Sequence, residues 1–308
     1  MRKRLTVWLV VPCIAVLMAA CGPSSATFDE SAHAEEVMQW RAGRLERLKQ
    51  PFGYLTQVGL YWLQPGSYSF GSGAGNDIVL DGESAAEIGV FTVTANGVSM
   101  RVLPGVDVQS EGERVTDIEI DADSTGFGVT VTHGSLAWTV VERDGEYAIR
   151  LRDFEHPFVT SFGPLPYFDI DPALRVQAIL HRYDEPRIAN VATVIEGVGY
   201  HPEMPGLVEF EIGGESYELE AYVSGDGLFY VFGDQTNRDD TYGAGRFLYS
   251  SMPAEDGKTV LDFNYAYSPP CAFNDFSTCP VASPRNRLPI RLEAGEKYDA
   301  KLHYSAGH

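Results

Sequence analysis

The carboxyl-terminal third of the chain holds the polar residues whose types and spacing could do chemistry. Asp262 and Asn264 lie two positions apart in a stretch that predicts a β-strand, so their side chains should share one face. Arg246 follows a glycine-rich entry to a neighbouring strand, where missing side chains allow a ligand to approach closely. A carboxylate, an amide and a guanidinium that meet can fix a polar ligand. We expect Tyr242 and Tyr267 at the edge of this candidate ligand site.

Two functions and one structural role are open for these residues. The first function is binding of a small polar molecule or an envelope partner. The second is hydrolysis, with Asp262 as the general base and Arg246 stabilising a developing anion. In the structural alternative, Arg246 pairs with Asp262 in the core and Asn264 caps the proline turn that follows. No Ser, Cys or His of this region has an evident base partner, which favours binding and leaves open whether the protein is an enzyme.

Two cysteines follow the candidate site. Cys271 and Cys279 have seven residues between them. In an oxidising compartment this spacing predicts a local disulfide, which would stabilise the fold by about 2–3 kcal/mol in the chain-entropy model. A metal site built on the two thiolates is the alternative, although the spacing is not one that is typical of zinc. We expect no bound metal and no cofactor.

The start of the chain predicts export and a lipid anchor. Three basic residues precede a short apolar run, so residues 1–20 are typical of a signal peptide. The run ends in Leu-Met-Ala-Ala-Cys, which resembles a lipobox and makes Cys21 the expected lipid-bearing N-terminus. Residues 21–28 would form a flexible lipidated tether. Because Gly22 follows the cysteine, we expect an envelope protein that is anchored in the outer membrane and faces the periplasm. Through the lipid on Cys21, the membrane is an expected partner of the protein.

Charge excludes one class of partner. The chain has 23 Lys and Arg against 43 Asp and Glu, a formal net charge of −20. Such a surface repels phosphate backbones, so we expect no nucleic-acid partner. A hydrophobic content of 44% argues against a disordered chain.

The distribution of apolar residues predicts a mainly β protein. Residues 29–50 have the spacing of one helix, which we expect to lie across the domain that follows it. Short strands separated by Gly, Asn and Asp turns then continue to the end of the chain. Prolines and a glycine between residues 153 and 166 place a boundary there. We therefore expect two antiparallel sandwich-like or barrel-like domains, over residues 51–160 and 161–308.

The carboxyl-terminal motif is long and specific. It comprises Asp234-Gln235-Thr236, Thr241-Tyr242-Gly243-Ala244-Gly245-Arg246-Phe247-Leu248, Leu261-Asp262-Phe263-Asn264-Tyr265-Ala266-Tyr267-Ser268-Pro269-Pro270-Cys271-Ala272-Phe273, Cys279-Pro280, Asn286-Arg287-Leu288-Pro289-Ile290 and Ala294-Gly295-Glu296-Lys297. Together these residues resemble the family known as domain of unknown function 1684. Ser268 departs from the family, which usually has Asn there. The resemblance implies no activity, because the family has none to carry over.

A second resemblance lies upstream. Phe70-Gly71-Ser72, followed by Asn76-Asp77-Ile78-Val79-Leu80, is similar to the opening of a forkhead-associated sandwich. Such domains bind phosphothreonine through an Arg after the Gly, and through a later Ser and His. Ser72 replaces that Arg here, so phosphopeptide binding is not expected even if the fold is shared. A hairpin with glycines at its turns is the alternative interpretation.

Overall fold

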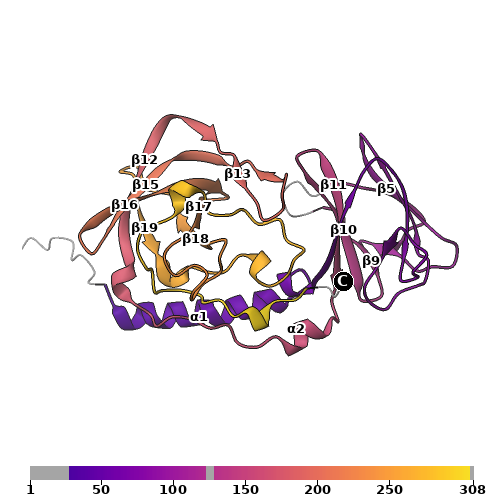
Figure 1. Cartoon of the computed structure of the whole chain (residues 1–308), viewed down its shortest axis with the longest axis horizontal. Helices are drawn as coiled ribbons and strands as arrows, with labels where there is room; N and C mark the ends of the chain where they lie inside the picture. The colour runs from indigo at the N-terminus through magenta and orange to yellow at the C-terminus, as the bar shows by residue number, and fades with distance from the viewer. Residues whose placement is uncertain (1–27, 123–127, 306–308) are drawn as a thin grey trace, which may run out of the picture.

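The computed structural model describes residues 28–122 and 128–305. Figure 1 shows two β-rich lobes side by side, with one long helix running along one side of the molecule. The expected signal peptide, Cys21 and all of the expected tether except its last residue lie outside the described residues. Within the described ranges, no helix is long and apolar enough to cross a membrane. The predicted mainly β fold with one N-terminal helix is confirmed.

The first lobe is a sandwich of two sheets. One sheet has the order β1-β11-β10-β9-β6-β7 and the other β3-β2-β4-β5-β8. Phe70 stacks on Phe91 between the sheets, and the edge of Trp138 packs against both rings. The strands are β1 (Gln57–Leu63), β2 (Gly66–Gly71), β3 (Ile78–Val79), β4 (Gly89–Thr94), β5 (Gly97–Val102), β6 (Gln109–Ser110), β7 (Glu113–Arg114), β8 (Asp117–Ile120), β9 (Val131–His133), β10 (Leu136–Arg143) and β11 (Glu146–Asp153).

Strand β11 gives the first lobe two different faces. Ile149 and Leu151 belong to the sandwich core, so the residues that alternate with them, Arg150 and Arg152, project from the opposite face. The turn between β10 and β11 is Asp144-Gly145, and both of its residues have positive φ, as a tight hairpin requires. The sequence of β11 therefore directs a row of arginines away from the core.

The second lobe is a strongly curved sheet with the order β18-β17-β16-β15-β12-β19. Its end strands β18 and β19 also contact each other, which brings the sheet close to a barrel. Phe210, Phe232 and Phe263 pack together in its core. The strands are β12 (Arg175–Ile188), β15 (Glu203–Ile212), β16 (Glu215–Ser224), β17 (Gly227–Phe232), β18 (Arg246–Ser251) and β19 (Lys258–Asp262), with a separate pair, β13 (Val191–Ala192) and β14 (Gly199–Tyr200).

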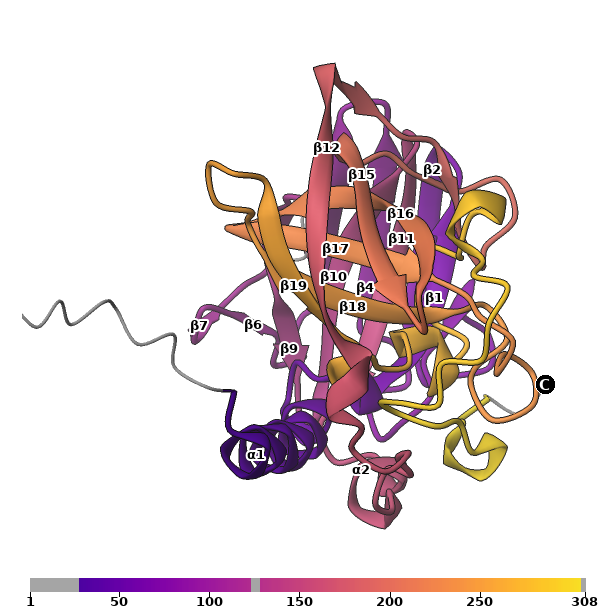
Figure 2. The same ribbon diagram turned by 90° about the vertical axis from the view of Figure 1, so that its left-hand side faces the viewer.

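Helix α1 (Glu30–Lys49) lies along the second lobe, as Figure 1 shows, and Figure 2 views the helix end on. The expectation that it lies across the domain that follows it is therefore wrong. The reason is in its buried face, which carries His33 and Arg44 as well as apolar residues. His33 Nε2 lies 2.6 Å from Asp262 Oδ2, and Arg44 donates to the Glu296 carboxylate, so both polar partners are in the second lobe.

The remaining elements are short helices in connecting segments. They are α2 (Pro157–Ser161) and the 3-10 helices η1 (Tyr54–Thr56), η2 (Pro172–Leu174), η3 (Phe263–Tyr265), η4 (Pro270–Ala272), η5 (Pro284–Asn286) and η6 (Ala300–Leu302). Element η3 corrects the predicted strand, which ends at Asp262. The Asp262 carboxylate accepts the backbone N–H of Asn264 at 3.1 Å, and this cap turns the chain out of the sheet.

Polar contacts join the lobes at several points. Ser277 donates to the Gln57 side chain at 2.7 Å, and both residues are buried. The Asn274 amide donates to the Tyr54 carbonyl at 2.9 Å. Near the carboxyl end, the Tyr304 hydroxyl donates to Asp81 of the first lobe at 3.2 Å. The chain therefore returns from the second lobe to the first, and these hydrogen bonds join the two lobes.

Candidate functional site

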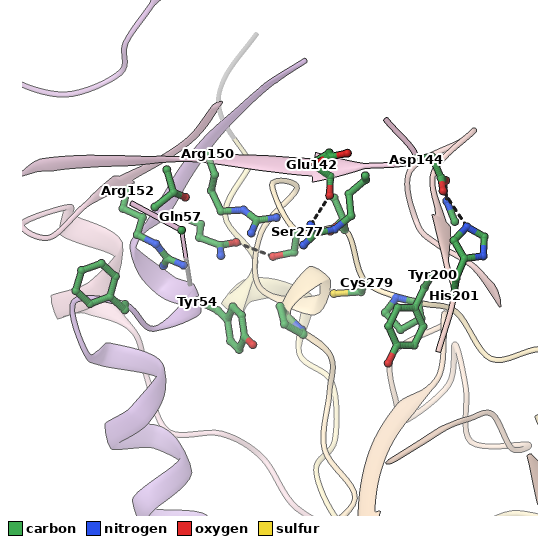
Figure 3. Close-up of a pocket in the computed structure, with 18 of the residues that line it drawn as sticks. Tyr54, Gln57, Glu142, Asp144, Arg150, Arg152, Tyr200, His201, Ser277 and Cys279 are labelled. Carbon is green, nitrogen blue, oxygen red and sulfur yellow. Dashed lines mark hydrogen bonds and ion pairs between the residues drawn. The ribbon is translucent and has the colours of Figure 1, made fainter. Parts of the chain in front are cut away.

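The candidate site is a cleft between the two lobes, with a volume of about 1050 Å³ (Figure 3). The first lobe contributes the outer face of strands β10 and β11. The second contributes the β14 region and the loop before and after Cys279. Its polar lining residues are Gln57, Thr130, Thr139, Glu142, Arg143, Asp144, Arg150, Arg152, His201, Ser277 and Thr278, and its aromatic ones include Tyr54 and Tyr200.

Three arginines stand on the first-lobe wall of this cleft. Arg150 lies opposite Thr139 of β10, and Arg152 lies opposite Gln57 of β1, so the sheet register sets their spacing. Figure 3 shows the Arg150 and Arg152 side chains extending from the strand toward the second lobe. Arg152 is held by the Gly53 carbonyl at 2.7 Å, and Arg143 by the carbonyl of its neighbour Glu142 at 2.7 Å. Fixed guanidinium groups of this kind bind carboxylates and phosphates well.

The hairpin tip of the first lobe closes one end of the cleft. The Asp144 carboxylate accepts the Gly199 backbone N–H at 2.6 Å and contacts His201 Nε2 at 2.8 Å. The bond from Gly199 and the contact with His201 hold the pKa of Asp144 below its usual value, so this carboxylate stays charged. Because the Asp144 charge is engaged by these two groups, it offsets the arginines of the cleft less than a free carboxylate would.

Arg246, expected at the candidate site, is fully buried in an ion pair with Asp234, not with Asp262. Its Nη2 lies 2.7 Å from Asp234 Oδ2, and it also donates to the carbonyls of Leu292 and Ala294. Burial lowers the pKa of Arg246, and the adjacent Asp234 carboxylate opposes this shift. The expected meeting of Arg246 with Asp262 is therefore wrong.

Asp262 and Asn264 do meet, although no strand aligns them. The Asn264 amide donates to Asp262 Oδ1 at 2.9 Å and to the Asp171 carbonyl at 2.8 Å. Asn264 is fully buried, and the other Asp262 oxygen lies against His33 and within 3.7 Å of Arg175 Nε. These contacts fix α1 and η2 to the second lobe. Neither Asp262 nor Asn264 lines the cleft or the groove described below.

The two tyrosines of the expected site lie apart from this pair. The guanidinium carbon of Arg44 lies 4.3 Å from the centre of the Tyr267 ring, and burial raises the pKa of that tyrosine well above its usual value. The Tyr242 ring packs on Tyr298, with ring centres 5.1 Å apart, and burial and the neighbouring Cys271 raise its pKa. Tyr267 lines a second, smaller cavity next to the cleft, whereas Tyr242 lines neither cavity.

Cys271 and Cys279 are buried thiols that lie close together. The Cys271 backbone N–H donates to the Cys279 sulfur at 3.2 Å, and burial raises the pKa of the Cys279 thiol well above its usual value. Their predicted disulfide stays a prediction. Among the described residues, no group of three or more His, Cys, Asp or Glu side chains could hold a metal ion. Because Cys279 lines the cleft, a disulfide between Cys271 and Cys279 would form part of the cleft wall.

The arginine wall is the part of the site that the sequence reasoning missed. In the run Tyr147-Ala148-Ile149-Arg150-Leu151-Arg152, arginines alternate with apolar residues. Two arginines at alternate positions opposite an apolar face are a signal that could have found it. The strand alone does not determine whether this face lies against a second lobe or is exposed to solvent, because tertiary contacts decide this.

Comparisons with known proteins place the second lobe in a family. The family model described as a protein of unknown function, DUF1684, matches residues 160–297. No curated protein matches the chain significantly.

Two solved structures are similar to parts of the chain. One is an uncharacterized protein from Haloarcula marismortui, determined by NMR in solution, with 31% identity and a TM-score of 0.39; the match covers 46% of this chain and 79% of that one. The other is EmbR of Mycobacterium tuberculosis in complex with a low-affinity phosphopeptide, with 16% identity and a TM-score of 0.21. That match covers 41% of this chain but only 32% of EmbR. Through residues 160–297, this chain belongs to the DUF1684 family of proteins of unknown function.

Proposed function

We propose that this chain is a lipid-anchored envelope protein that binds a small, negatively charged polar ligand in the cleft between its lobes. The observation that carries the proposal is the concentration of Arg143, Arg150 and Arg152 on one wall of a large cleft. In a chain of net charge −20, such a cluster opposes the overall field and marks a place where an anion is locally favoured.

The rest of the cleft lining suits a polar anion. Gln57, Ser277 and Thr278 supply hydroxyl and amide groups beside the arginines, and Tyr54 and Tyr200 supply apolar faces. A few directed polar groups on a partly apolar wall are typical of small-molecule sites. The fixed Gln57–Ser277 contact keeps one side of the cleft in place, so little ordering is needed on binding.

The hydrolase alternative requires Arg246 and Asp262 to act together on a substrate, and the contacts of both residues argue against this. Arg246 is buried against Asp234, and Asp262 is engaged by His33 and Asn264. A general base must reach its substrate, and neither side chain lines the cleft. Binding is therefore the function that the geometry supports best, with the lipid on Cys21 holding the protein at the outer membrane on its periplasmic side.

The test is a thermal-shift and calorimetry series with galacturonate, citrate and phosphate as anionic probes and galactose as the neutral counterpart. We expect anions to raise the melting temperature and galactose to leave it unchanged. Arg143→Gln should weaken the anion that binds best by about tenfold, because one charge-assisted hydrogen bond is lost. Arg101→Gln is the matched control, since Arg101 is a largely exposed arginine of the same lobe outside the cleft.

Two results would contradict the proposal. One is that none of the anions binds. The other is that an anion binds but that Arg143→Gln and Arg101→Gln weaken it equally, because this would assign the effect to general charge and not to the cleft.

A further inference from the structure

The cleft does not end at the lobe interface. A second cavity of about 430 Å³ lies against it, and Phe52, Tyr54, Phe247 and Pro270 line both. The second cavity, which we call the aromatic groove, continues from these shared residues along the carboxyl-terminal half of α1. Its remaining lining residues are Trp40, Arg44, Arg47, Leu48, Gly53, Tyr249 and Tyr267.

The aromatic groove presents ring faces that are open to solvent. Phe52 is 59% exposed, Tyr54 42% and Tyr249 49%, which is unusual for rings of this size gathered in one place. Tyr249 stacks nearly parallel to Tyr267, which in turn is held by Arg44. Tyr249 also packs on Phe229, and Phe52 packs on Phe154, so the fold holds these rings in place while a large part of each stays exposed to a ligand.

The groove is also cationic. Arg47 is exposed in the last turn of α1 and lines the groove, whereas the charge of Arg44 is matched by Glu296. Arg47 thus continues the positive wall formed in the cleft by Arg143, Arg150 and Arg152. A ligand that fills both cavities meets the arginines of the cleft, Arg47, and the aromatic side chains of the groove.

We propose that the ligand is an acidic oligosaccharide, a chain of sugar rings that carry carboxylates, bound with its charges in the arginine cleft and its ring faces on the aromatic groove. The inference rests on the proposed function and names the ligand class of the same site. The cleft alone is at the upper end of the range for a drug-sized ligand, so cleft and groove together suit a longer chain. The C–H faces of sugar rings pack on aromatic side chains, and tyrosine hydroxyls can bond to sugar hydroxyls.

The experiment uses the full chain without its signal and four probes: hexagalacturonate, galacturonate, the neutral chain cellohexaose and hexathymidylate. We expect hexagalacturonate to bind at least about tenfold more tightly than galacturonate by calorimetry. Tyr249→Ala should weaken hexagalacturonate by about tenfold and leave galacturonate unchanged, because only the longer chain reaches the groove. Tyr217→Ala is the control, since Tyr217 is a half-buried tyrosine of the same lobe outside both cavities.

The possible negative results separate the oligosaccharide inference from the proposed function. If galacturonate binds and depends on Arg143 but the hexamer gains nothing, the oligosaccharide inference is wrong and the proposed function stands. Equal binding of cellohexaose or of hexathymidylate would also overturn the inference, because it would remove the need for charge or for sugar. If no probe binds, the inference is overturned, and the further absence of binding by citrate and phosphate would overturn the proposed function as well.

Discussion

Arg246 and Asp234 are both fully buried and form an ion pair 2.7 Å long. The pair shows what the charged residues of the family motif do in this protein: Asp234 receives Arg246, and Glu296 receives Arg44 of helix α1. Each of these charges would be costly to bury alone. The charged residues Asp234, Arg246 and Glu296 therefore hold the second lobe and the helix together, and none of the three lines the cleft or the groove.

Removing Arg246 should be strongly destabilising. Arg246→Ala leaves the Asp234 carboxylate buried without its partner, so we expect a loss of about 3–5 kcal/mol in the free energy of unfolding by urea titration. Arg285→Ala, which removes an exposed arginine 3.8 Å from Glu218, should cost less than about 1 kcal/mol. A loss below about 1 kcal/mol for Arg246→Ala would contradict the structural role of the pair.

The two cysteines make a second prediction at this scale. Their burial together and the expected export of the chain lead us to expect a disulfide in the protein purified from the envelope. Alkylation in denaturant should add no label until a reductant is present, as read by mass spectrometry. Denaturant is needed because buried thiols resist alkylation whether or not they are paired. Two labels without reductant would show that the thiols are free.

At the scale of elements, features set by local sequence patterns could be predicted from the sequence, whereas features set by tertiary contacts could not. The helix spacing around Val37 and Leu48 and the alternation along β11 are local, so these elements could be predicted. The pairing of Arg246 with Asp234 could not be predicted, because it depends on how strand β18 packs against the loop that carries Asp234. The end of β19 was missed because the Asp262 side chain caps a turn and competes with the sheet.

The carboxyl-terminal segment should make stability sensitive to alkaline pH. Burial and the nearby Asp81 carboxylate raise the pKa of Tyr304 to about 12. Because the folded state holds this proton more tightly than the unfolded chain, whose pKa is about 10, the contribution is complete below about pH 10 and is lost as the pH rises toward 12.

Tyr304→Phe should therefore flatten the fall of the free energy of unfolding across that pH window, because the variant has no phenol to ionise there. Tyr217→Phe is a suitable control, since Tyr217 belongs to the second lobe and is not part of this tie. The same pH dependence in wild type and Tyr304→Phe would contradict the assignment.

At the scale of the whole molecule, the two β lobes form the walls of the cleft, and helix α1 connects the second lobe to the expected lipid anchor. Helix α1 is fixed to the second lobe by His33 and Arg44, so a lipid on Cys21 would place that lobe near the membrane. The first lobe supplies the arginine wall, and the hairpin tip at Asp144 closes the cleft against His201. Both lobes line the cleft, so a motif confined to one lobe does not describe the proposed binding site.

The anchor can be tested directly. Labelled fatty acid should enter the wild-type protein and should be absent from Cys21→Ser, which should also leave the membrane fraction, because one residue carries the lipid. Cys279→Ser, a change to a cysteine far from the N-terminus, should keep its label. Equal labelling of Cys21→Ser and wild type would show that Cys21 is not the acceptor.

The central claim, that the interlobe cleft is the ligand site, is tested most directly by hydrogen exchange with and without the best-binding anionic probe, read by mass spectrometry. Bound ligand should slow exchange in the peptides that form the cleft walls, around residues 139–152, 199–201 and 277–280, and leave the 234–246 and 258–264 peptides unchanged. Protection confined to the peptides around Arg246 and Asp262, with none along β10 and β11, would contradict this account.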